Sequence, residues 1–131
     1  MTATAQHAQV AAAISEDHLV RNTIALATAL GWLAHHCRPA HTDKGWRTPI
    51  QGTTGFPDLI AIRGGWQIVA ECKTQRGRLT TTQSRWQDAY RALAATPGGR
   101  VLYFVWRPVD LLDGTIRAVL TDPGSARAAP P

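Results

Sequence analysis

Three residues, Asp58, Glu71 and Lys73, have side chains whose types could together do chemistry. Two carboxylates that lie side by side repel each other, and a hard divalent cation, which prefers oxygen ligands, would remove that repulsion. A Mg²⁺ ion held there could bind a phosphate oxygen and lower the pKa of a bound water, while the lysine positions the water or neutralises charge on the phosphate. This combination indicates metal-assisted hydrolysis of a phosphodiester.

The spacing of the two acids predicts that they face each other across a β-hairpin. Residues 58–62 and 67–73 are strand-like runs, and the Arg-Gly-Gly-Trp segment between them predicts a tight turn. A turn centred on the two glycines sets Asp58 opposite Glu71, with Cβ atoms about 5 Å apart on one side of the sheet. Lys73 lies two residues further along and shares that side. The plainer alternative is that Asp58 only begins a strand while Glu71 pairs with Lys73 at an exposed strand end.

Helical period, capping residues and turn residues predict the elements around this hairpin. They are a helix from Ser15 to Gly31, a short strand over 32–37, a long loop over 38–54, a helix that begins at Thr80, a strand over 101–106, and a short helix or last strand over 109–120. The order αβββαβ predicts a mixed α/β fold, in which a small mixed sheet with the hairpin at its centre is flanked by helices. Trp86 and Trp106 are expected in the core.

The chain length favours one compact domain. Of its 131 residues, 15–121 are expected to form that domain, after a flexible lead-in over 1–14 and before a loose tail rich in proline and alanine over 122–131. No apolar run approaches the roughly 20 residues that a membrane helix needs. The N-terminus lacks a secretory signal pattern, and the two cysteines are too few for a disulfide scaffold. We therefore expect a cytoplasmic protein with no membrane partner.

Positive charge is concentrated in one stretch of the chain. The net charge is +5, from 14 basic and 9 acidic residues, and between residues 73 and 107 Asp88 is the one acid beside seven basic residues. A stretch of this kind favours nucleic acid as the partner. The residues expected to contact DNA lie after the lysine, in the long loop and on the second helix: Arg76, Arg78, Lys44, Trp46, Arg47 and Arg85.

Four features in sequence order resemble the PD-(D/E)XK nuclease superfamily, in particular its small VRR-Nuc and Holliday-junction-resolvase-like branch, which is common in phages. The Gly-Phe-Pro-Asp run that ends at Asp58 and the Glu-Cys-Lys run that ends at Lys73 carry the likeness to the superfamily. The Ser-Glu pair at the start of the first helix and the Thr-Thr-Thr-Gln run from Thr80 carry the likeness to the branch. The resemblance spans roughly residues 15–107, and the chain beyond Trp106 does not match it.

The resemblance implies a restriction-endonuclease-like core with Asp58 and Glu71 as metal ligands and Lys73 as the catalytic lysine. It also implies that Glu16 is a further ligand or orients the attacking water, although the helix dipole alone would explain an acid in the first turn of a helix. Gln83 would line the site by the same likeness, and a capping-box role would explain it equally well. The implied cofactor is Mg²⁺, for which Mn²⁺ would substitute.

The expected function is that of a metal-dependent endonuclease that cuts DNA, with branched DNA or Holliday junctions as the expected substrate. A homodimer is expected if the cuts are paired, because two symmetric sites then meet two strands. If the protein is phage-encoded, it would act in the cytoplasm of the bacterial host. Two alternatives stay open: a nuclease of linear duplex or single-stranded ends, and a non-catalytic DNA-binding protein with the same fold.

Overall fold

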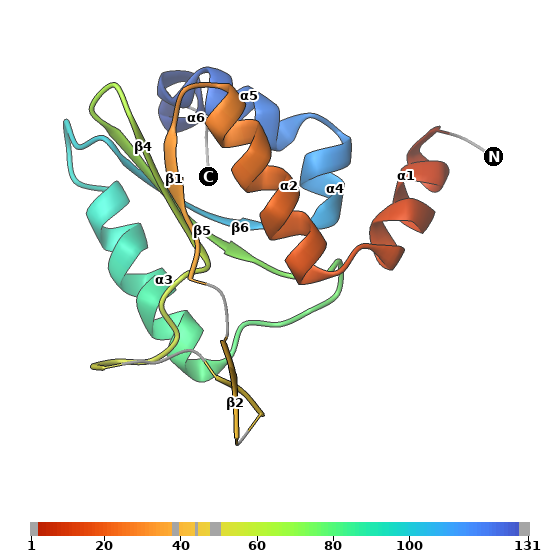
Figure 1. The fold of residues 1–131 in the computed structure, drawn as a ribbon. Helices are drawn as coiled ribbons and strands as arrows, with labels where there is room; N and C mark the ends of the chain where they lie inside the picture. The colour runs from red at the N-terminus through yellow and green to blue at the C-terminus, as the bar shows by residue number, and fades with distance from the viewer. Residues whose placement is uncertain (1–2, 38–39, 44, 48–50, 129–131) are drawn as a thin grey trace.

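The computed structural model describes residues 3–37, 40–43, 45–47 and 51–128, and its main sheet has the strand order β1-β4-β5-β6. These strands are β1 (Leu33–His35), β4 (Leu59–Arg63), β5 (Trp66–Cys72) and β6 (Val101–Trp106). Strands β1, β4 and β5 pair antiparallel, whereas β5 and β6 pair parallel. A parallel pair needs a crossover connection, and helix α3 (Thr81–Ala94) lies in that connection (Figure 1).

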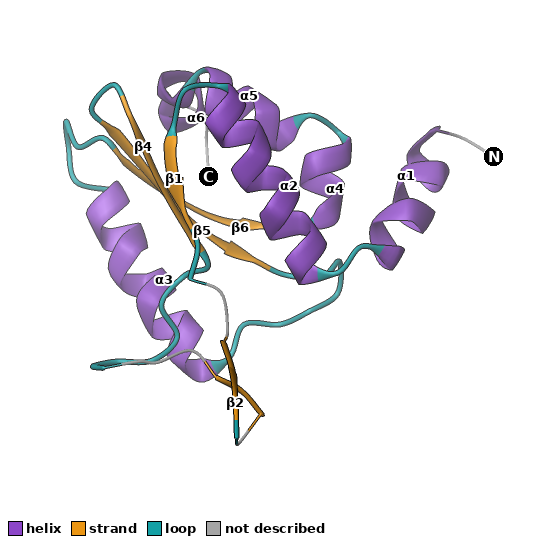
Figure 2. Cartoon of the chain, in the orientation of Figure 1, coloured by secondary structure: helices purple, strands orange, loops and turns teal. Residues whose placement is uncertain are grey.

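Helices cover both faces of this sheet (Figures 1 and 2). One face carries α2 (Glu16–Ala29), α4 (Pro108–Leu112), α5 (Thr115–Thr121) and α6 (Pro123–Ala128), and α3 covers the other. The hydrophobic core fills the first face, where alternate residues of β4 and β5 meet α2 and α5: Leu59, Ala61, Ile68, Ala70, Leu19, Val20, Ile116 and Leu120. None of the α3 residues, all of which the structure describes, is fully buried. The α3 face of the sheet is therefore the more open one.

The hairpin of β4 and β5 has the predicted register. Ile60 pairs with Val69, and the two turn glycines have φ values of 57° and 80°. A two-residue type I′ turn requires positive φ at both central positions, which glycine adopts without strain. Extended outward, the same register sets Asp58 opposite Glu71 at the end of the hairpin far from the turn.

Capping residues mark the start of both main helices, as predicted. The Ser15 hydroxyl accepts a hydrogen bond from the His18 backbone N–H at 3.1 Å, and α2 begins at the next residue. Thr80 and Gln83 form the capping box of α3. Strand β6 covers residues 101–106, and the mixed α/β fold with a central hairpin is confirmed.

Both ends of the chain contain a helix, where a flexible, partly helical lead-in and a loose tail were expected. Helix α1 (Ala3–Ala13) lies against α4 and buries Ala11. The tail forms α6, whose first turn is capped by Asp122, because this carboxylate accepts from the Ser125 backbone N–H at 3.3 Å and from its hydroxyl at 2.6 Å. Asp122 followed by Pro123 is a helix-start signal, because aspartate caps a helix and proline suits its first position. The content of proline, glycine and alanine in the tail predicted a loose segment instead.

Two internal segments contain helices or strands that the sequence did not define. The long loop contains β2 (Ala40–Thr42) and β3 (Gly45–Arg47), which pair only with each other among the described strands. Residues 109–120, predicted as a short helix or a strand, lie mostly in α4 and α5. No described helix combines the length and apolarity that crossing a membrane requires.

Candidate active site

Asp58 and Glu71 form a carboxyl pair at the end of the hairpin. Glu71 is 2% exposed and hydrogen-bonds to Asp58. Asp58 is itself fixed, because its Oδ2 accepts from the backbone N–H of Cys72 at 2.8 Å. Burial, followed by the contact with Asp58, raises the pKa of Glu71 from 4.5 to about 9. One proton or one cation is thus needed to hold the two acids together in this position.

Lys73 stands beside the pair and brings Glu16 to it. The Lys73 Nζ atom lies 4.0 Å from Glu71 Oε1 and 3.8 Å from Glu16 Oε1, and the residue is 7% exposed. Its backbone N–H donates to the Trp106 carbonyl at 3.0 Å, which continues the pairing of β5 with β6 by one residue. Glu16, at the start of α2, therefore joins the site through the lysine, and its side chain stays half exposed.

Gln83 combines the two roles that the sequence left as alternatives. Its Oε1 accepts from the Thr80 backbone N–H at 2.9 Å, which completes the capping box of α3. Its Nε2 donates to Glu71 Oε1 at 3.0 Å. The start of α3 is thus linked directly to the buried carboxyl group of Glu71. The amide oxygen of Gln83 caps the helix, and its amide nitrogen binds the carboxyl group.

The donor set suits a hard divalent cation. Asp58 and Glu71 supply oxygen only, and Mg²⁺ is commonly bound by one or two carboxylates together with waters and substrate phosphate. Among the described residues no group of three or more His, Cys, Asp or Glu side chains that could hold a metal ion is found. The raised pKa of Glu71 is a second sign of fit, because a cation would take the place of its proton.

Tyr103 is a neighbour of the site that the sequence did not indicate. Its hydroxyl is buried and has no hydrogen-bond partner among the described residues. Burial, and then the charge of Glu71, raise the pKa of Tyr103 to about 12. Its ring stacks on Tyr90 of α3, with centroids 6.1 Å apart. Alternation along β6 could have assigned Tyr103 to a face, but only the parallel pairing of β6 with β5 shows that this face holds Glu71.

The basic stretch divides into exposed and structural side chains. Arg76, Arg78 and Arg85 are exposed, as contact with DNA would require. Arg107 instead turns inward, where its Nη1 donates to the carbonyls of Thr74 and Gly77 at 2.7 Å each and so holds the turn between Lys73 and Arg78. The seven basic residues therefore do not act as one surface.

The predicted DNA contacts of the long loop are only partly placed by the structure. Lys44 lies outside the described residues. Trp46 and Arg47 belong to β3, whose backbone is described while their side chains are not.

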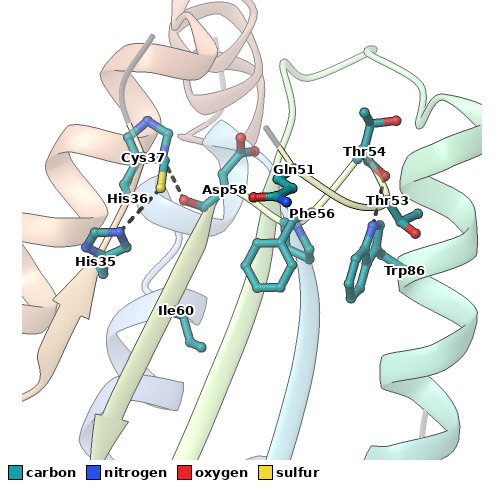
Figure 3. A pocket seen from close by; sticks show the side chains of 12 residues that line it. His35, His36, Cys37, Gln51, Thr53, Thr54, Phe56, Asp58, Ile60 and Trp86 are labelled. Carbon is teal, nitrogen blue, oxygen red and sulfur yellow. Dashed lines mark hydrogen bonds between the residues drawn. The ribbon is translucent and has the colours of Figure 1, made fainter. Parts of the chain in front are cut away.

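A cavity of about 510 Å³ opens beside Asp58. Its walls come from the end of β1, the segment that leads into β4, β4 itself and α3 (Figure 3). In Figure 3, His35, His36 and Cys37 stand on one side and Phe56 and Trp86 on the other, with Ile60 of β4 between them. Trp86, expected in the core, is half-buried and lines this cavity, whereas Trp106 is buried as expected.

No protein-family model matches the chain, and no curated protein sequence matches it significantly.

Proposed function

We propose that this protein is a Mg²⁺-dependent endonuclease that hydrolyses DNA phosphodiester bonds. The observation that carries the proposal is the carboxyl pair of buried Glu71 and half-buried Asp58, with the Lys73 amine 4.0 Å from Glu71. A purely structural role would leave two opposed acids at a cost in stability, with no gain to offset it. The restriction-endonuclease-like resemblance of the same three residues supports the proposal.

Each residue of the site has a distinct task in this reaction. Asp58 and Glu71 hold the cation, and hydrogen bonds from Cys72 and Gln83 fix their orientation. When bound, Mg²⁺ supplies positive charge to the phosphate and makes the attacking water more acidic. Lys73 orients that water or stabilises the negative charge that builds up on the phosphate.

Glu16 and the substrate complete the proposal. Glu16, 3.8 Å from Lys73 Nζ, orients the lysine and through it the water. The exposed Arg76 and Arg78 follow the lysine in the chain and bind flanking phosphates. Branched DNA is the substrate that the family resemblance favours, and paired cuts in it would call for a homodimer. Mn²⁺ is expected to replace Mg²⁺, because it shares the preference for oxygen ligands.

The test is cleavage of labelled linear, flapped and four-way DNAs, with and without Mg²⁺. Lys73→Ala should lose about 100-fold or more in rate, yet bind DNA in a gel shift. Asp58→Asn retains an oxygen that can accept from the Cys72 N–H and relieves the repulsion with Glu71. It should therefore be nearly inactive but at least as thermally stable as the parent in the absence of Mg²⁺.

Asp88→Asn is the matched control, because Asp88 is an exposed acid of α3 outside the carboxyl pair, and it should cut at the parental rate. Parental cleavage rates in both Lys73→Ala and Asp58→Asn would reject the proposed site. A parent protein that binds these DNAs and cuts none of them would instead be a non-catalytic DNA-binding protein.

A further inference from the structure

The cavity beside Asp58 has the size and walls of a ligand site. Its volume of about 510 Å³ lies within the roughly 300–1,000 Å³ that small-ligand pockets have. Asp58 belongs both to the cavity wall and to the carboxyl pair. Whatever occupies the cavity therefore lies next to the proposed cleavage position.

The wall that faces His35 and His36 offers an aromatic surface. Phe56 is 48% exposed although its ring packs edge-on against Trp86, with centroids 5.0 Å apart. Trp86 is held in turn, because its Nε1 donates to the Thr54 carbonyl at 2.9 Å. A fixed aromatic pair with an exposed ring is a surface on which a flat, uncharged ring can stack.

The other walls favour a neutral occupant over a phosphate. Ile60 and Pro57 are apolar, Asp58 would repel an anion, and no arginine or lysine lines this cavity in the part of the chain that the structure describes. The side chains of Gln51 and Thr53 also line it, and their amide and hydroxyl groups can hydrogen-bond the polar edge of a ring. Arg85 lies outside, where it lines a shallower pocket with Thr53 and Trp86. A strand that leaves the cavity on this side would meet the positive charge of Arg85, away from the carboxyl pair.

We infer that the cavity receives an unstacked base of a DNA strand, next to the phosphate at the carboxyl pair. A base within a continuous duplex is stacked and paired and cannot enter, so the favoured substrate carries unpaired nucleotides beside the cut. This inference rests on the proposed function for the position of the cut, whereas the binding of the base is measured independently of cleavage.

The experiment compares the affinity of oligothymidylate with that of an abasic oligomer of the same length and charge, with Ca²⁺ in place of Mg²⁺. The parent should bind oligothymidylate about 10-fold more tightly than the abasic oligomer, because stacking of one base on an aromatic side chain raises the affinity by about this factor. Phe56→Leu keeps an apolar side chain against Trp86 and removes the aromatic face, so the affinity ratio should fall to about 1. Leu93→Ala truncates an equally exposed apolar residue of α3 away from the cavity and should preserve the ratio.

A ratio of about 1 in the parent, or an unchanged ratio in Phe56→Leu, would overturn the assignment of the cavity. A separate measurement with Mg²⁺ compares cleavage of a forked DNA with that of the fully paired duplex. A base-dependent affinity without cleavage of either DNA would leave the cavity as a base site and reject the nuclease proposal. Equal cleavage of both DNAs together with a ratio of about 1 would retain the nuclease and reject the base site.

Discussion

At the scale of single residues, Glu71 carries the largest electrostatic cost in the described site. It is buried, it hydrogen-bonds to a second acid, and the Lys73 amine lies 4.0 Å from it. Gln83 adds a hydrogen bond to it but no charge. The surroundings therefore disfavour the ionised form of Glu71 unless a cation is present, and the stability of the protein should depend on pH and on Mg²⁺ together.

We expect the metal-free protein to lose stability as pH rises from about 4.5 towards 9. The pKa of Glu71 is raised on folding, so the unfolded chain releases this proton first. The stabilisation is then complete below the unfolded pKa and is lost as pH rises through the folded one. One such group contributes at most about 1.4 kcal/mol per pH unit. The measurement is the free energy of unfolding across this range in EDTA, for the parent and for Glu71→Gln.

Glu71→Gln should remove this component of the slope, because its amide does not titrate in this range. Asp88→Asn, which changes an exposed acid, should keep the component. Mg²⁺ should restore stability to the parent at high pH and have little effect on Glu71→Gln, since a ligand that binds only the folded state stabilises it. Equal slopes in the parent and in Glu71→Gln would contradict the assigned burial cost.

At the scale of elements, the segment before β4 is packed onto the start of α3. Gly55 has a φ of 87°, and a Cβ atom there would lie 2.6 Å from the backbone carbon of Thr82 and 2.8 Å from the backbone nitrogen of Gln83. Asp58 follows Gly55 by three residues in the chain, and Gln83 donates a hydrogen bond to Glu71. This close approach therefore holds two parts of the site, from separate elements, in one place.

Gly55→Ala should destabilise the protein by more than Gly52→Ala and should also lower activity. Both glycines have positive φ, 87° and 95°, so the backbone strain of about 1–2 kcal/mol is matched. A Cβ at Gly52 meets no atom within 4 Å, whereas one at Gly55 must push the segment away from the backbone of α3. The measurements are the free energy of unfolding and the cleavage rate of each variant. Equal losses in both variants would show that the packing at Gly55 does not position Asp58.

At the scale of the whole molecule, three of the twelve arginines support the fold through hydrogen bonds to backbone carbonyls. Arg63 donates to the carbonyl of Leu30 at 2.8 Å and stacks over Trp32, and Arg127 donates to the carbonyls of Ala94 and Thr96 at 2.7 Å each. Together with Arg107, these side chains bind carbonyls at helix ends and turns, where the guanidinium satisfies acceptors that the backbone leaves open. The net charge of +5 therefore overstates the charge available for DNA.

We expect the salt dependence of DNA binding to come from the exposed arginines that follow Lys73. Changing both Arg76 and Arg78 to Ala should weaken binding and reduce the slope of log affinity against log salt by roughly one to two units, at about 0.9 per lost phosphate contact. Arg117→Ala, on α5 at the other face of the sheet, removes an exposed charge and should leave the slope unchanged. An unchanged slope in the double variant would show that this turn does not touch the DNA backbone.

The sequence by itself determined the features that depend on near neighbours. Two glycines between strand-like runs are enough to set the hairpin register, because side chains alternate strictly along a strand. Ser15 and Thr80 are enough to start two helices, because a cap acts within one turn. The facing of Asp58 and Glu71 follows from the first of these rules.

Only the tertiary structure decided which distant segments complete the site. Glu16 reaches Lys73 because α2 packs across the core face, and Tyr103 approaches Glu71 because β6 pairs in parallel with β5. The cavity is assembled from β1, the segment before β4, β4 and α3. Arg107 belongs to the basic stretch in the sequence, but in the fold its guanidinium donates to the carbonyls of the turn after Lys73. Such contacts depend on how layers pack and on where a crossover returns, and no short-range pattern in the chain encodes either.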